Sequence, residues 1–214
     1  MEYLDIVCIS DSHTRPFGDL PEANLLLFTG DGTSVGRIEE VTRLNKMFKE
    51  VSHRYDKIVM IPGNHDLLFE RDRRLALEIM EDAEVLIDSG TNFEGFNIWG
   101  SPYTPRFMHW AFNADRGEDI QRHWDMIPDK TDILITHGPP KGILDQIKAG
   151  EEHLGCQQLM VTVDKIKPKL HAFGHIHGGY GQFKSADTLF VNSSLVTETY
   201  QPLNKAIKVT IFKD

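Results

Sequence analysis

The sequence predicts a layered α/β fold with mixed β-sheets. In the first 82 residues, short apolar runs alternate with segments of helical periodicity. The second half is richer in strand-like runs, and an alternating half followed by a strand-rich half is typical of layered α/β proteins. Polar residues that could bind a ligand directly follow several of the apolar runs. Sites in α/β folds usually lie at the carboxyl ends of strands, so this placement fits the same fold class.

The first half of the chain holds three predicted strands and two predicted helices. The strands are the apolar runs at residues 3–10, 24–29 and 57–61. A helix is predicted over residues 37–53, because apolar side chains recur there at helical spacing. These side chains are Ile38, Val41, Leu44, Met47 and Phe48. The second helix is predicted over the charged segment 69–82.

The second half is predicted to contain short strands and two helices. The strands are at residues 85–87, 96–100, 132–136, 170–173, 188–191 and 206–212. The helices are at residues 117–124 and 156–166. Residues 101–117 combine prolines with several aromatic residues and are predicted to form a long irregular loop. No repeat or linker interrupts the chain, so we predict a single domain over residues 1–214.

Length and composition limit the classes of protein that fit. A chain of 214 residues can bury a core without disulfides, and Cys8 and Cys156 are its only cysteines. Cys8 lies within an apolar run and is predicted to be buried. The formal net charge of −9 argues against a general nucleic-acid coat protein, and no nucleic-acid-binding domain is expected.

The amino-terminal residues lack the basic start and long apolar stretch of a secretory signal. No apolar run approaches the length that spans a bilayer. We therefore expect a cytoplasmic protein with no membrane partner.

Five short segments carry residue types that suit a pair of metal ions and a phosphoester. They are Asp11-Ser12-His13, Gly30-Asp31, Gly63-Asn64-His65-Asp66, Thr136-His137-Gly138 and Gly174-His175-Ile176-His177. Together they offer carboxylates, an amide oxygen and imidazoles, with no thiolate. This mixture favours first-row divalent or trivalent metals over calcium or an iron–sulfur cluster. One Asp-x-His would carry little information, whereas five such segments in order are a specific signal.

The ordered set resembles the calcineurin-like metallophosphoesterases over nearly the whole chain. The resemblance implies a layered sandwich of two mixed β-sheets flanked by helices. It also implies two metal ions bridged by Asp31, with His65 facing the substrate instead of binding metal. The remaining ligands would be Asp11, His13 and His177 for one metal and Asn64, His137 and His175 for the other.

The chemistry gives these residue types a reason. Two cations held about 3.5–4 Å apart by one carboxylate can engage the same phosphate, and coordination lowers the pKa of bound water. The cations also neutralise charge that develops on the phosphoryl oxygens. His65 is predicted to protonate the leaving alkoxide or to stabilise the phosphate. Asp66 is predicted to orient a neighbouring imidazole.

A narrower resemblance comes from three segments. Residues 100–113, Thr136-His137-Gly138-Pro139-Pro140 and residues 174–181 are similar to the metallophosphoesterase-domain-containing proteins. That subgroup has reported cyclic-nucleotide phosphodiesterase activity. One departure is Gly32, where a bulkier apolar residue is common, and greater local flexibility is expected there. The aromatic residues of segment 101–117 could form a base-stacking wall or a packed surface loop.

The leading functional hypothesis is hydrolysis of small phosphodiesters, cyclic nucleotides among them, by a metal-activated hydroxide. Two metal ions per chain are expected, with manganese, iron, zinc, cobalt and nickel as candidates. The expected partner is a small phosphodiester or nucleotide. Alternatives are a phosphomonoesterase or protein phosphatase, a nuclease, and a non-catalytic binding scaffold. Against a protein phosphatase, Asp31 is followed by Gly32-Thr33-Ser34 and lacks the Asp-Arg-Gly continuation.

Several residues outside the motifs leave questions open. Arg15, Arg37, Arg106 and Arg116 could each reach the site and would then favour a dianionic monoester. Among the remaining histidines, His109 is kept as a candidate because of its loop, whereas four are expected to be structural or exposed: His53, His123, His153 and His171. Gly178-Gly179 fits either a plain turn or a loop that approaches the metals.

Overall fold

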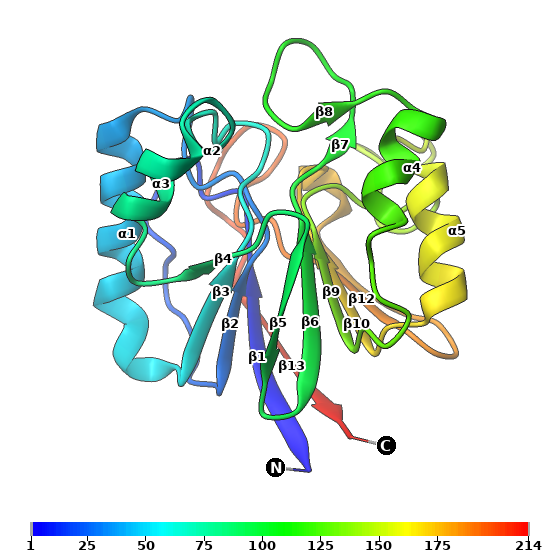
Figure 1. Cartoon of the computed structure of the whole chain (residues 1–214), viewed down its shortest axis with the longest axis horizontal. Helices are drawn as coiled ribbons and strands as arrows, with labels where there is room; N and C mark the ends of the chain where they lie inside the picture. Colours follow the sequence, from blue (N-terminus) through cyan, green and yellow to red (C-terminus); the bar gives the residue numbers. More distant parts are fainter. Residues whose placement is uncertain (1, 214) are drawn as a thin grey trace.

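Two mixed β-sheets pack face to face, and helices cover both outer faces (Figure 1). The computed structural model describes residues 2–213. The first sheet has the order β13-β1-β2-β3-β4, and the second has the order β11-β12-β10-β9-β6-β5. This arrangement confirms the predicted α/β sandwich of two mixed sheets flanked by helices.

The first sheet is parallel except at one edge. Its strands are β1 (Tyr3–Ile9), β2 (Leu25–Phe28), β3 (Lys57–Met60), β4 (Glu84–Val85) and β13 (Ile207–Phe212), and β13 runs antiparallel to β1. Its outer face is covered by α1 (Ile38–Val51), α2 (Leu68–Arg71) and α3 (Arg73–Ile79), with a 3-10 turn at Ser52–Arg54. Helix α1 begins where the Glu40 side chain accepts a hydrogen bond from the Arg37 backbone at 2.9 Å, which satisfies a donor at the helix start.

The second sheet is parallel in its centre and antiparallel at both edges. Its strands are β5 (Ser89–Phe93), β6 (Phe96–Ser101), β9 (Ile133–Thr136), β10 (Leu170–Phe173), β11 (Gly181–Lys184) and β12 (Leu189–Asn192). Helices α4 (Glu118–Trp124) and α5 (Gln157–Ile166) cover its outer face. A 3-10 turn, His177–Gly179, follows β10.

Alternation along β1 shows how the core divides into layers. Ile6 and Cys8 point into the layer between the two sheets, whereas Val7 and Ile9 point toward the helices of the first sheet. A strand that buries both faces forms a continuous apolar run, which is why residues 3–10 are recognisable in the sequence. Cys8 is fully buried, as predicted.

Four segments differ from the sequence prediction. The helix predicted over residues 69–82 is broken at Asp72, whose backbone leaves the helical region and whose side chain accepts a hydrogen bond from Leu75 N at 3.1 Å. Strands β5 and β11 are absent from the sequence prediction. The loop predicted over residues 101–117 contains a short two-stranded ladder of β7 (Thr104–Pro105) and β8 (Asn113–Ala114).

Within residues 2–213, no helix combines the length and the apolar character that a bilayer crossing requires.

Candidate metal centre and active site

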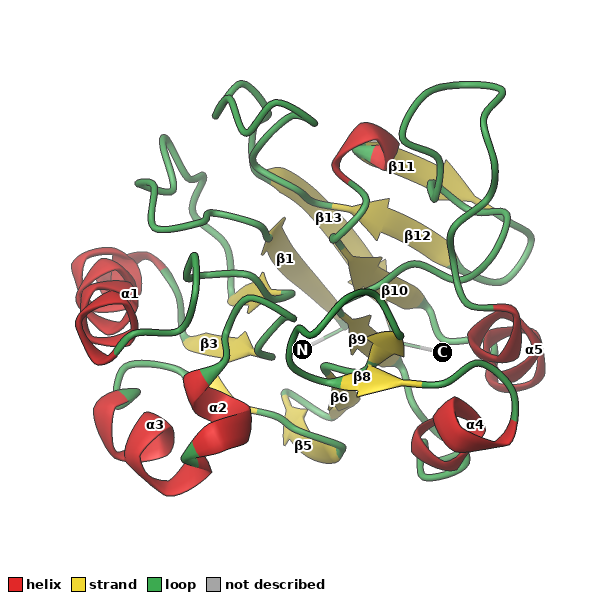
Figure 2. Cartoon of the chain, turned by 90° about the horizontal axis from the view of Figure 1, so that it is seen from above, coloured by secondary structure: helices red, strands yellow, loops and turns green. Residues whose placement is uncertain are grey.

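The parallel strands of the two sheets end on the same side of the molecule (Figure 2), and the predicted ligands follow their carboxyl ends. Asp11 follows β1, Asp31 follows β2 and Asn64 follows β3. His137 follows β9, and the pair His175 and His177 follows β10. Because neighbouring parallel strands end at the same side, segments far apart in the sequence meet here.

Four of the ligand residues have a left-handed backbone. The φ angles are 52° at Asp11, 43° at His13, 58° at Asp31 and 66° at His175. Among non-glycine residues, Asn, Asp and His are enriched in this region. Tight approach of the loops also requires glycines: a Cβ on Gly174 would collide with the Asp11 carboxylate and the Ser10 hydroxyl. At Gly30 both conditions apply, since φ is 104° and a Cβ would meet the His137 ring.

The first group of ligating atoms comes from Asp11, His13 and His177, and these atoms lie within 4.8 Å of one another. His177 Nε2 is 3.4 Å from Asp11 Oδ1. Asp11 is fully buried, and its carboxylate also accepts hydrogen bonds from the Ser10 hydroxyl and the His175 backbone. Burial raises the pKa of Asp11, but His177 outweighs this effect and brings it to about 2.

The second group comes from Asp31, His137 and His175. Asp31 Oδ2 is 3.3 Å from His137 Nε2 and 3.8 Å from His13 Nε2. Asp31 therefore reaches both groups, which is the position that a bridging carboxylate needs. Asn64 Oδ1 lies 2.9 Å from His137 Nε2 and so points into the same group.

The donor set fits a pair of cations. His13 Nε2 is buried without a hydrogen-bond partner among the described residues, although it faces two carboxylates. Burial of such a nitrogen is unfavourable unless something binds it. Burial lowers the pKa of His13, and burial followed by the charge of His137 lowers the pKa of His175 to about 3. Both imidazoles are therefore neutral, the form that binds metal.

Backbone carbonyls orient three of the imidazoles. His137 Nδ1 lies 2.9 Å from Thr29 O, His65 Nδ1 lies 2.7 Å from Ser34 O, and His177 Nδ1 lies 3.2 Å from Thr197 O. In each case Nδ1–H donates to the carbonyl, so Nε2 is the ring nitrogen that faces the centre of the site. Such partners fix the ring and raise its basicity as a ligand.

The role predicted for Asp66 is wrong. Its carboxylate accepts hydrogen bonds from the backbone amides of Gly32, Thr33 and Gly63 and from the Thr33 hydroxyl, and from no imidazole of residues 2–213. Burial and the charge of Asp31 raise the pKa of Asp66 to about 6. Asp66 therefore fastens the Asp31 loop to the Asn64-His65 loop. The orienting role that we expected of it belongs to backbone carbonyls.

His65 lies at the centre of the site. Its ring stacks on Trp110 with centroids 4.0 Å apart and meets the His13 ring edge-on at 4.8 Å. A ring nitrogen of His65 also lies within 4.8 Å of ligating atoms of His13 and Asp31. The predicted position, beside the ligands and facing the pocket, is where the structure puts it.

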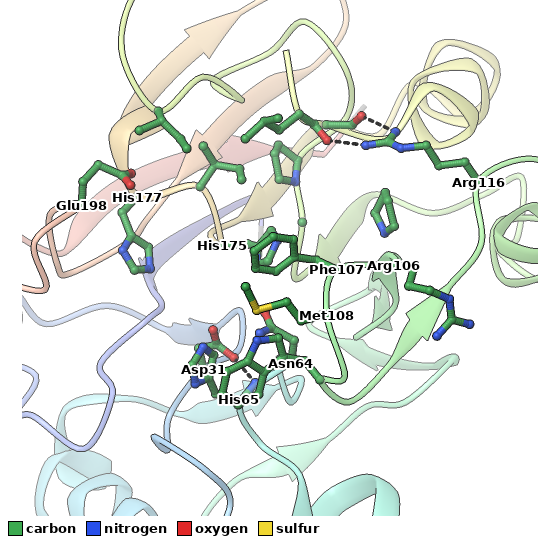
Figure 3. A pocket seen from close by; sticks show the side chains of 18 of the residues that line it. Asp31, Asn64, His65, Arg106, Phe107, Met108, Arg116, His175, His177 and Glu198 are labelled. Atoms are coloured by element: carbon green, nitrogen blue, oxygen red, sulfur yellow. Dashed lines mark hydrogen bonds between the residues drawn. The ribbon is translucent and has the colours of Figure 1, made fainter. Parts of the chain in front are cut away.

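A cavity of about 490 Å³ opens above these residues (Figure 3). In that view Phe107 and Met108 lie in the middle of the pocket, with His177 and Glu198 on the left and Arg116 on the right. Phe107 and Trp110 line the pocket, whereas Phe112 is buried in the core against Tyr103. Part of the aromatic segment therefore lines the pocket, and part of it packs in the core.

Two further parts of the site carry no sequence motif. Residues 197–200 place the Thr197 carbonyl behind His177, the Glu198 carboxylate on the amide of Gly178, and the Tyr200 ring 4.9 Å from His13. Residues 141–156 supply Ile147, Leu154 and Gly155 to the pocket. No residue pattern in the sequence marks either segment as part of the site. The folded structure does so, through the closeness of Tyr200 to the ligands and through the pocket residues of the second segment.

The other candidate histidines and arginines differ in whether they line the pocket. His109 is exposed and does not line the pocket. His123 pairs with Asp88, His153 pairs with Asp145, and His171 is buried beside Thr136. Among the arginines, Arg106 and Arg116 line the pocket, whereas Arg15 donates to the His13 carbonyl at 3.4 Å.

The glycines singled out in the sequence are packed. A Cβ on Gly32 would collide with the Leu44 side chain, so this departure from the family pattern is tightly packed in the core instead of loose. Gly178 and Gly179 form a 3-10 turn that packs against the backbone of Ile147 and Leu144. The glycine pair thus makes a turn, and the turn lets a pocket loop approach His177.

Comparisons with known proteins agree with this site. The family model described as calcineurin-like phosphoesterase matches residues 4–179. Metallophosphoesterase domain-containing protein 1 of Homo sapiens is 36% identical over 235 residues, covering 98% of this chain and 71% of that protein. A probable glycerophosphodiester phosphodiesterase GpdQ of Arcobacter nitrofigilis is 26% identical over 178 residues, covering 73% and 58%.

Among solved structures, TT1561 of Thermus thermophilus shares the fold. The TM-score is 0.58 at 12% identity, with 88% of each chain covered. The family match spans every predicted ligand. The chain therefore belongs to the calcineurin-like phosphoesterase family.

Proposed function

We propose that the protein hydrolyses small phosphodiesters with the help of two bound metal ions. Its family is one of metal-dependent phosphoesterases. The observation that carries the proposal is the convergence of six ligand residues around Asp31, with His65 beside them on the pocket side. Asp11, His13 and His177 would hold one ion, and Asn64, His137 and His175 would hold the other, with Asp31 between them.

The ions would supply Lewis-acid polarisation of the phosphoryl oxygens and a water of lowered pKa. The protein's own contribution is to hold the phosphate against His65. Because Ser34 O accepts from His65 Nδ1, the proton for a leaving alkoxide would be carried on Nε2. Stacking on Trp110 restricts the rotation of that ring.

Charges around the pocket favour a diester over a monoester. A monoester is a dianion and needs cationic donors in addition to the metals. Arg106 is paired with Asp115 at 2.5 Å, and Arg116 donates to two backbone carbonyls, so both cations in the lining are engaged. Glu198 adds a negative charge to the same wall. A diester, with one charge fewer, suits this environment better.

The relatives extend the proposal to substrates. One relative is named as a probable glycerophosphodiester phosphodiesterase, which supports diester hydrolysis by this site. Cyclic nucleotides fit the same chemistry, since they are small diesters. For the metals, a set of carboxylate, amide and imidazole ligands accepts manganese, iron, zinc, cobalt or nickel.

The test compares bis-p-nitrophenyl phosphate with p-nitrophenyl phosphate at equal metal loading, followed by 2′,3′- and 3′,5′-cyclic nucleotides. We expect a higher kcat/KM for the diester. Metal content is measured on the same sample. Faster hydrolysis of the monoester would instead assign a phosphatase, and no hydrolysis with two ions bound would assign a non-catalytic scaffold.

A further inference from the structure

The pocket has a roof made of two loops that sequence motifs do not mark. The aromatic loop (residues 105–116) contributes Phe107 and Met108, and the rear loop (residues 141–156) contributes Ile147 and Leu154. Phe107 is 55% exposed and Met108 is 65% exposed, although both point into a pocket (Figure 3). Exposed apolar side chains that face a cavity from two sides mark a binding surface for an apolar group.

Arg116 ties the two loops together. Its guanidinium donates to Gly155 O at 2.9 Å and to Leu154 O at 2.7 Å, so the end of the aromatic loop is joined to the rear loop (Figure 3). Two donors from one planar group fix direction as well as distance. The spacing of the two apolar walls is therefore set by a side chain at the edge of the pocket.

Contacts that do not involve Arg116 also hold the rear loop in place. Asp145 is buried, and its carboxylate accepts from the amides of Gly142 and Gly155 and pairs with His153. Pro140 and Cys156 close the base of the loop with a β-bridge. The backbone of Ile147 packs against Gly178, directly after the ligand His177. The wall is thus fixed relative to the metal ligands.

The charges in the lining identify what the roof can hold. Within the described chain, the Lys and Arg residues that line the pocket are Arg106 and Arg116, and both are engaged elsewhere. Glu198 adds an anion to the lining beyond the ligand Asp31. A carboxylate on the substrate would have to compete with Asp115 for Arg106 and with the rear-loop carbonyls for Arg116, whereas an uncharged ring would find Met108 and Leu154.

We propose that the roof is a subsite for an uncharged, flat apolar substituent of the phosphodiester, and that Arg116 is the positioning residue that sets its width. The inference rests on the proposed function and deepens it. It assigns aryl or heteroaryl phosphodiesters as the substrate class and predicts that an anionic group on that substituent weakens the substrate.

The experiment uses three p-nitrophenyl diesters whose second substituent is methyl, phenyl or 4-carboxyphenyl. Each loses p-nitrophenolate to water, so the same bond breaks and release is read by absorbance. Values of kcat/KM are divided by the uncatalysed hydrolysis rates. The metal-loaded protein should prefer phenyl over methyl by about 10-fold or more, the scale for filling an apolar pocket. The carboxyphenyl ester should fall below the phenyl ester.

Variants locate the preference. Met108→Ala and Leu154→Ala should each lower the phenyl-to-methyl ratio several-fold. Arg116→Gln should lower it too, and Arg116→Lys, which can still donate to the two carbonyls, should restore part of it. The matched control is His109→Ala, which changes an exposed residue of the same loop outside the pocket lining and should leave the ratio unchanged.

Two outcomes would overturn the subsite: a phenyl-to-methyl ratio near one, or variants that slow both esters equally. If the metal-loaded protein hydrolyses neither ester, the proposed function fails first. The subsite is then tested by titration calorimetry with phenylphosphonate and methylphosphonate. Tighter binding of phenylphosphonate, lost in Met108→Ala, supports the subsite, and equal binding contradicts it.

Discussion

The floor of the pocket and its roof are held in different ways. The floor, made of the ligand residues and His65, is largely buried: Asp11 and His137 have no exposed surface. Carbonyls behind its imidazoles and the four hydrogen bonds of Asp66 fix it from below. The roof, made of the aromatic and rear loops, is exposed and apolar. The guanidinium of one side chain, Arg116, hydrogen-bonds across the gap between its two loops.

The difference separates chemistry from selectivity. A change in the floor disturbs every substrate, because the reacting phosphate lies there whatever its substituents are. A change in the roof alters the contacts of one substituent and so alters the choice between substrates. His65 is the place where the two regions touch, because its ring is a neighbour of His13 below and stacks on Trp110 above.

The largest effect is expected from Asp31→Asn. It keeps the size of the side chain but removes the charge that both ligand groups share. Loss of a direct ligand should exceed the cost of about 10–100-fold in metal affinity that outer partners show. Activity toward every ester should fall with the metal content, read by atomic emission after dialysis. A variant that keeps two ions and normal turnover would contradict the bridging position.

His65→Ala comes next. It should lose about 10²–10⁴-fold in kcat, the usual scale for a general acid–base group. Both metal ions should remain bound, because His65 is expected to face the substrate. Metal analysis and turnover are measured on one preparation. If the ions leave together with the activity, His65 is a ligand and the floor has one more member than we assign.

Trp110→Ala tests where the boundary lies. Because Trp110 stacks on His65, Trp110→Ala should lower kcat for the methyl and the phenyl esters alike. The loss should be smaller than in His65→Ala, at about 10²-fold, the low end of the range for acid–base groups. Trp110→Phe, which keeps a flat ring, should recover most of it. A loss confined to the phenyl ester would show that Trp110 affects selectivity and not the chemistry at His65.

The last prediction concerns the pH dependence of stability and leaves the chemistry of the floor unchanged. His171 is fully buried with Nε2 2.8 Å from Thr136 Oγ1, and burial lowers its pKa to about 3. The unfolded chain takes up this proton below about pH 6.5, while the folded chain stays neutral. The contribution of His171 to stability is therefore complete above about pH 6.5 and falls by about 1.4 kcal/mol per pH unit toward about pH 3.

The measurement is urea unfolding at several pH values between neutral and mildly acid, for the parent protein and His171→Gln. The variant removes the titrating group, so its free energy of unfolding should fall less steeply with acid. Parallel slopes would show that His171 does not contribute, and that other groups govern acid sensitivity.

The sequence predicts those elements that their own residues stabilise and misses those that depend on neighbouring strands. Buried strands such as β1 and β10 carry their own apolar pattern, and ligand motifs follow them directly. Four strands are absent from the prediction: β7 and β8 form the short ladder of the aromatic segment, and β5 and β11 are the two edges of one sheet. Their segments, Ser89–Phe93 and Gly181–Lys184, are partly exposed and polar, and hairpin partners impose their extended form.

The site shows the same division. Eight of the nine predicted site residues form the floor and the ninth, Asp66, supports it, and short sequence motifs mark all nine. The partners of Asp66 differ from the prediction, since backbone and hydroxyl donors surround it and no sequence pattern records them. The sequence predicts no role for Tyr200 and leaves undecided whether Arg116 reaches the site, because both roles depend on loops that meet only in the folded chain.

The left-handed backbone at Asp11, His13, Asp31 and His175 gives these positions a second reason to keep their residue types. Asp, Asn and His are both good metal ligands and the non-glycine residues that enter this conformation most readily. A descendant that stopped binding metal would still be under selection for them on conformational grounds. The ligands without positive φ, namely Asn64, His137 and His177, are free of that constraint. Among diverging relatives, those three positions are therefore the better record of whether catalysis has been kept.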